Sequence, residues 1–168
     1  MDNKTSSKPS YAVWLNLTLA ACGVFFFCCL LGDIFGYSFC KYCWNGGLFN
    51  ESYLPFLSFL ESDNVRFVVF LTCFYLSTGI SYIIIYSVVN LLINLKKNII
   101  FDKVNTRYMT AISVCCFLIC LVCIIGACAS YALFLISLIG LFVGLIVQCV
   151  RLVMDKAIDM RSELDLTV

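Results

Sequence analysis

Twelve cysteines and the absence of histidine limit the chemistry open to this chain of 168 residues. Cys40 and Cys43 have the C-x-x-C spacing, which in an oxidising compartment forms a disulfide or acts as a redox pair. A second C-x-x-C, Cys120 and Cys123, suggests a four-thiolate zinc site, but this second pair lies in an apolar stretch and the two pairs could not converge. No serine, cysteine or carboxylate has a histidine to activate it. We therefore expect no catalytic residue, no metal, no cofactor and no enzymatic activity.

The elements that position these cysteines are membrane spans. The 43 residues from Tyr108 to Val150 carry no charge, and one helix of that length would be about 65 Å long, twice the hydrocarbon core of a bilayer. The chain must therefore cross twice, with Gly126 to Ser130 as the turn at the far interface. A mean hydropathy of +1.00 and two further apolar stretches indicate an all-α integral membrane protein, a bundle of four transmembrane helices.

The positions of Lys and Arg set the expected orientation. Nine of the eleven cations fall before the first span, between the second and third, or after the fourth, so those segments and both termini are expected to be cytoplasmic. The near-neutral net charge gives no reason to expect direct nucleic-acid binding. The expected boundaries are a tail 1–10, spans 11–32, 67–95, 108–127 and 131–153, an external loop 33–66, a cytoplasmic loop 96–107 and a tail 154–168.

The first span also contains Leu19-Ala-Ala-Cys22, the pattern that a bacterial lipoprotein signal peptidase reads. Cleavage there would remove residues 1–21 and leave Cys22 lipidated. We expect an uncleaved helix instead, because Gly23 to Leu31 stays apolar where a mature lipoprotein begins a polar tether. The other three spans keep the same orientation in both cases.

With this topology, Cys40 and Cys43 fall in the external loop, as does the C-x-x-C pair of four-span thiol oxidases. Such an enzyme needs a second external pair to relay electrons, and the turn from Gly126 to Ser130 offers only Cys128. We therefore expect a structural disulfide between Cys40 and Cys43, or two free thiols. A membrane thiol-disulfide oxidoreductase that uses both is the alternative function.

Transport is disfavoured because ion-coupled carriers place charged groups within the membrane. The second, third and fourth spans have none, and Asp33 is expected at the outer interface. Stripes of small and polar residues recur at helical spacing in three spans and predict close helix packing. They are Ala12, Asn16, Ala20 and Gly23; Ser113, Cys116, Cys120, Cys123 and Ala127; and Ser137, Gly140, Gly144, Gln148 and Arg151. We expect Gly140 and Gly144 to pack within the monomer, with a homodimer contact as the alternative.

Two short motifs lie on the cytoplasmic side. Asp102 is placed to cap a helix that begins at Lys103. Ile100-Phe-Asp-Lys-Val-Asn105 between spans 2 and 3 and the ending Glu163-Leu-Asp-Leu-Thr-Val168 resemble those of short bacterial four-span proteins in a numbered domain-of-unknown-function family. The resemblance covers span order and loop lengths across most of the chain. Asp102 stands where that family usually has Ser or Thr, and the wealth of cysteine is not typical of it.

The resemblance implies a bacterial plasma-membrane protein without an established activity. Genes of such proteins often lie beside one for a small Cro-like helix-turn-helix regulator, which implies a regulatory or interaction partner of a cytoplasmic transcription factor. An acidic tail is compatible with docking of a basic DNA-binding domain, and a solvated helix end is the alternative. A free terminus could also enter a carboxylate-binding groove. The docking residues that we expect are Asp159, Glu163, Asp165, Leu166 and Val168.

Overall fold

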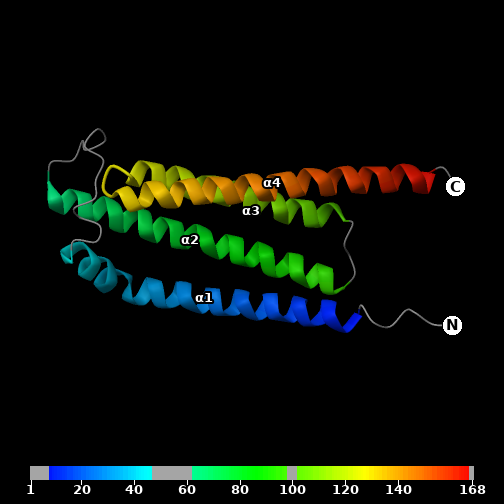
Figure 1. Ribbon diagram of the computed structural model, residues 1–168, viewed down its shortest axis with the longest axis horizontal. Coiled ribbons are helices and arrows are strands. Elements are labelled where there is room, and N and C mark those ends of the chain that lie inside the picture. Colours follow the sequence, from blue (N-terminus) through cyan, green and yellow to red (C-terminus); the bar gives the residue numbers. More distant parts are fainter. Residues whose placement is uncertain (1–7, 47–61, 98–101, 167–168) are drawn as a thin grey trace.

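The computed structural model describes residues 8–46, 62–97 and 102–166 and contains four helices in those ranges, without a strand among them. They are α1 (Lys8–Asn45), α2 (Asp63–Lys96), α3 (Lys103–Gly126) and α4 (Tyr131–Leu166). The helices run back and forth along the long axis of the molecule, which is horizontal in Figure 1. Because neighbours in sequence are antiparallel, α1 starts and α4 ends at the same end.

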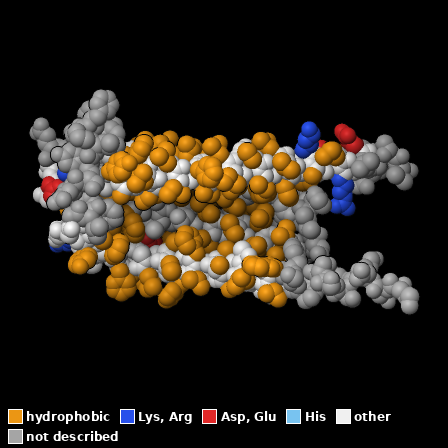
Figure 2. All heavy atoms as spheres, in the orientation of Figure 1, with side chains coloured by type: hydrophobic (Ala, Val, Ile, Leu, Met, Phe, Trp, Pro, Cys, Tyr) orange, Lys and Arg blue, Asp and Glu red, His pale blue; other side chains and the backbone are white. Residues whose placement is uncertain are grey.

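All four helices are long and apolar enough to cross a membrane. The shortest, α3, has 24 residues and is about 36 Å long at 1.5 Å per residue, which exceeds the hydrocarbon core of a bilayer. Hydrophobic side chains cover the middle of the visible face, and charged side chains gather at its ends (Figure 2). The chain is a multi-pass membrane protein, as its sequence predicted.

We call the two ends of the molecule the basic end and the hairpin end. The basic end carries Lys96, Lys103, Arg107 and Arg151, and the hairpin end carries the α3–α4 turn, the end of α1 and the start of α2. The turn comprises residues 127–130, as predicted. The backbone amides of Ala129 and Ser130 donate to the Gly126 carbonyl at 2.9 and 3.3 Å, so the polar groups of the turn are satisfied without regular helix.

The helices form an open row. Within the described residues, α1 comes close only to α2, α2 only to α1 and α3, and α4 only to α3. At the hairpin end, a core cluster adds side-chain contacts across the whole row. Its members are Cys40, Trp44, Phe70, Cys73, Cys123, Ala129 and Leu133. The arrangement is therefore looser than the tight four-helix bundle that the small-residue stripes predicted.

The packing of α3 against α4 follows two of those stripes. All five members of the α3 stripe, from Ser113 to Ala127, are buried. On α4, a β-carbon built on Gly144 would lie 3.2 Å from Cys116 Cβ and 3.1 Å from Phe117 Cε1, so any larger residue would require α3 to shift by a few tenths of an ångström. The Ser113 hydroxyl donates to the Gly144 carbonyl at 3.2 Å. Both helices can approach closely because both present small residues.

The stripe on α1 does not pack in this way. Asn16 and Ala20 are exposed, and nothing lies within 4 Å of a β-carbon built on Gly23. Instead, α1 turns a different face toward α2, which includes Phe26, Asp33 and Gly36. A β-carbon on Gly36 would be 2.8 Å from Phe74 Cε1. This correction has a simple cause: a stripe of small residues permits a close approach, but the partner helix decides whether one occurs.

The first helix is also longer than the span that the sequence predicted. We placed the start of the external loop at Asp33, yet α1 continues to Asn45. The segment from Ile34 to Phe39 contains no proline and is rich in aromatic residues, so nothing in it stops a helix. Within the expected loop 33–66, residues 47–61 lie outside the described part of the chain.

Candidate functional site

The basic end begins with the helix cap that the sequence predicted. Asp102 has extended backbone angles, and its Oδ1 accepts a hydrogen bond from the Val104 amide at 3.0 Å. This satisfies one of the free amides in the first turn of α3. One turn on, Asn105 is fully buried and its Oδ1 accepts from Asn94 Nδ2 of α2 at 2.9 Å. The polar contact joins the end of α2 to the start of α3.

A charged cleft lies between the start of α3 and the last turns of α4. It has a volume of about 370 Å³ and is lined by Lys103, Thr106, Arg107, Asp155, Ile158 and Asp159. Arg151 Nε lies 3.3 Å from Asp155 Oδ2. The cleft thus brings two cations of α3 opposite two carboxylates of α4.

Beyond this cleft, α4 continues alone. Asp159 lies opposite the first turn of α3, and α4 runs seven residues further to Leu166. Figure 1 shows this end of α4 extending past the other helices. Asp159, Arg161 and Glu163 are exposed on the projecting segment. Among the described residues, no other helix accompanies this charged end of α4.

The structure describes the expected docking residues to different extents. Asp159 and Glu163 are exposed on α4, and Asp165 and Leu166 lie in its last turn, where only the backbone is described. Val168 lies outside the described residues. The two glycines of the α4 stripe face the neighbouring helix of the same chain, because Gly140 approaches the Cys116 carbonyl as Gly144 approaches Phe117.

The hairpin end contains a second polar cluster, centred on Arg66. This residue is 8% exposed; its Nη2 donates to the Ala129 carbonyl at 3.2 Å, and its Nη1 lies 3.6 Å from Asp63 Oδ1. The guanidinium carbon is 5.5 Å from the centroid of the Trp44 ring. Trp44 Nε1 also donates to Asp63 Oδ2 at 3.5 Å. The cluster joins α1, α2 and the α3–α4 turn, so its contacts point to a structural role.

Cys40 and Cys43 lie in the last turns of α1 and not in a loop. Both are free thiols, 2% and 5% exposed. Cys40 packs in the same core cluster as Cys73 and Cys123. Reactive dithiols are at least partly accessible, so this burial gives no support to the oxidoreductase alternative. No group of three or more Cys, Asp or Glu side chains in the described ranges is arranged to hold a metal ion.

Asp33 lies in the middle of a span, although the sequence placed it at the outer interface. The carboxylate accepts a hydrogen bond from the Tyr82 hydroxyl at 2.5 Å, and the Asp33 carbonyl accepts one from the Tyr75 hydroxyl at 3.4 Å. Tyr75 is about 18 Å from the start of α2 and Tyr82 about 21 Å from its end, at 1.5 Å per residue. The carboxylate therefore lies level with the middle of α2.

Three of these residues had only weak signals in the sequence. Arg66 was visible only as one of two cations, with Lys41, in the predicted external loop, and Asn105 only as a member of a motif. Asp33 was visible as the one carboxylate next to a span, but the length of α1 was needed to give its depth. The uncharged, aromatic run of seven residues between Asp33 and Lys41 is the signal that could have located it.

Comparisons with known proteins agree with the family resemblance. Residues 3–168 match the family described as "Protein of unknown function (DUF2975)". No curated protein and no solved structure matches the sequence.

Proposed function

Because this chain belongs to the DUF2975 family over nearly its whole length, we propose its role from its own geometry: it is a membrane-anchored docking protein for a cytoplasmic partner. The observation that supports this proposal most is the projection of α4 beyond the start of α3. On the positive-inside rule, the basic end that carries this projection is cytoplasmic in a bacterial plasma membrane. The role is regulatory and does not involve catalysis.

The partner that we propose is a small helix-turn-helix transcription regulator. A DNA-binding domain presents a basic surface, and Asp159 and Glu163 offer exposed carboxylates at the projecting end of α4. Binding there would hold the regulator at the membrane and compete with DNA for the same basic surface. Release of the partner would then free it to bind DNA.

Co-fractionation tests this proposal. Deleting Glu163 to Val168, or replacing Asp159 and Glu163 together by Asn and Gln, should move a co-expressed regulator from the membrane fraction to the soluble fraction. Arg161→Gln changes one charge of the opposite sign on the same helix end and serves as the matched control. It should leave the regulator on membranes. Unchanged co-fractionation of the deletion variant would contradict the proposal.

A further inference from the structure

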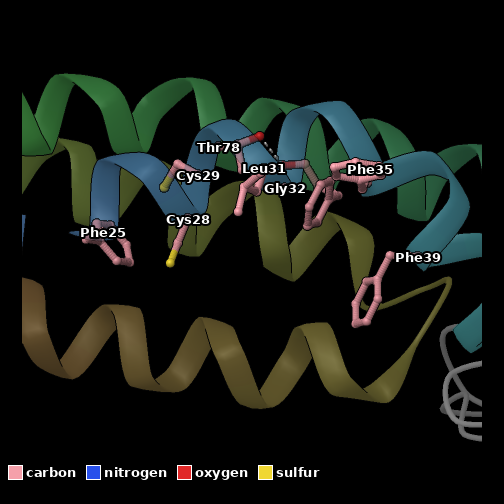
Figure 3. Close-up of a pocket in the computed structure, with 10 residues that line it drawn as sticks. Phe25, Cys28, Cys29, Leu31, Gly32, Phe35, Phe39 and Thr78 are labelled. Carbon is pink, nitrogen blue, oxygen red and sulfur yellow. Dashed lines mark hydrogen bonds between the residues drawn. The ribbon is translucent and has the colours of Figure 1, made fainter. Parts of the chain in front are cut away.

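The seam between α1 and α2 contains two apolar grooves with Asp33 between them. One groove has a volume of about 470 Å³ and is lined mainly by aromatic and small residues. Phe25, Cys28 and Phe39 of α1 point to one side of that helix in this groove (Figure 3). The other groove has a volume of about 390 Å³ and is lined by residues that include Phe26, Tyr82 and Tyr86.

Asp33 lies between the residues that line the two grooves, although it lines neither groove itself. Its neighbours on α1, Cys29, Gly32 and Gly36, line the first groove, and Tyr82, which donates to its carboxylate, lines the second. The Tyr82 ring also meets Phe26 edge to face, with the centroids 5.6 Å apart. Asp33 is itself only partly buried. A molecule that enters the seam from the lipid therefore meets aromatic rings and one carboxylate.

Nothing positive balances this carboxylate. In the described ranges, the ion pairs join Arg66 to Asp63 and Arg151 to Asp155, and neither involves Asp33. A carboxylate removed from water is stabilised by a cation that lies beside it, and a hydroxyl donor alone supplies less. Aromatic faces add attraction for a cation and little for a neutral chain. Lipid tails would fill the grooves but would not use Asp33.

We propose that the α1–α2 seam around Asp33 binds lipophilic organic cations, that is, molecules with a quaternary ammonium or phosphonium centre inside an apolar shell. The cationic centre lies against the Asp33 carboxylate, and its apolar groups occupy the aromatic grooves on either side. This site is separate from the docking surface at the basic end, and neither proposal depends on the other. The lack of charge in the other three spans argued against a ligand pathway. Asp33 in α1 supplies a charged group within a span, so that argument no longer holds for this chain.

Equilibrium binding to the full-length protein in nanodiscs of neutral lipid tests the site. Tetraphenylphosphonium should bind saturably, and Asp33→Asn should weaken that binding about tenfold or more, the loss expected for one charge-assisted contact. Tetraphenylborate has nearly the same shape with the opposite charge and should not bind saturably. Asp159→Asn, at the basic end, should leave phosphonium binding unchanged.

A second measurement needs no variant. Dicyclohexylcarbodiimide, which reacts with carboxyl groups inside membranes, should label Asp33 in the unaltered protein, and tetraphenylphosphonium should protect it in proportion to its occupancy. The proposal is overturned if phosphonium does not bind saturably, if Asp33→Asn binds it equally well, if the borate binds as tightly, or if labelling of Asp33 is unaffected by phosphonium.

Discussion

Replacing Gly126 with alanine adds one methyl group where α3 ends against α2 and α4. A β-carbon built there lies 2.6 Å from Leu133 Cδ1, 2.8 Å from Cys73 Sγ and 3.3 Å from Cys73 Cβ. Carbon contacts are favourable at about 3.5–4.0 Å, so two neighbours must each move by roughly 1 Å. Leu133 can change rotamer, but Cys73 is short, and its Sγ already donates to the Val122 carbonyl at 3.6 Å.

The expected change in the free energy of unfolding combines two opposing terms. Adding a methyl to a packed site typically destabilises by about 1–3 kcal/mol. Alanine favours the helix over glycine by about 1 kcal/mol, and this offsets part of the loss. We therefore expect Gly126→Ala to be less stable by about 1–2 kcal/mol, measured by detergent-induced unfolding in mixed micelles and followed by circular dichroism.

The chain offers two matched controls for this prediction. Nothing lies within 4 Å of a β-carbon on Gly79, so Gly79→Ala should be neutral or slightly stabilising. Gly144→Ala, with contacts of 3.1–3.3 Å to Phe117 and Cys116, should fall between the other two variants. If Gly126→Ala proves as stable as Gly79→Ala, the close contact of α2, α3 and α4 at Gly126 is wrong.

Three further predictions concern polar contacts. Asp102→Ala should destabilise α3 by about 1 kcal/mol, and Asp102→Ser should restore most of the loss, as measured by thermal unfolding; equal stability of all three would argue against the cap. Arg66→Gln should destabilise by about 1–3 kcal/mol with loss of the hydrogen bond to the Ala129 carbonyl, and Arg66→Lys should not rescue it; tryptophan fluorescence would follow this unfolding. A double-mutant cycle of Asn94→Ala and Asn105→Ala should give a coupling of about 1 kcal/mol, and additive losses would show that the two amides do not interact.

Much of the fold was predictable because a bilayer restricts what a chain can do. A long uncharged stretch must form helices that satisfy their own backbone, and its single break must lie at an interface. The turn at residues 127–130 and the start of α3 at Lys103 both followed from local residue types. The buried stripe of α3 followed from helical spacing. Each of these features depends on residues that are close together in sequence.

The features that were missed depend on residues far apart in sequence. Asp33 ended the first span in the sequence because a charge usually leaves the membrane. In the structure, the Tyr82 hydroxyl of another helix accommodates the carboxylate, so α1 continues. Arg66 is buried because Trp44, Asp63 and the Ala129 carbonyl surround it. Apart from Asp63, which is three residues from Arg66, these partners are distant in the sequence and cannot be read from the neighbouring residues.

The sequence by itself thus determined the class, the four helices, the hairpin and the family, since hydropathy and backbone satisfaction act locally along the chain. The tertiary structure alone decided which helices meet, which small-residue stripe faces a partner, and how deep Asp33 lies. Those outcomes depend on side-chain contacts between helices, and hydrophobicity cannot select among them because lipid and helix surfaces are equally apolar. The open row, in which the backbone of α1 approaches only that of α2 within the described residues, is the clearest result of that selection.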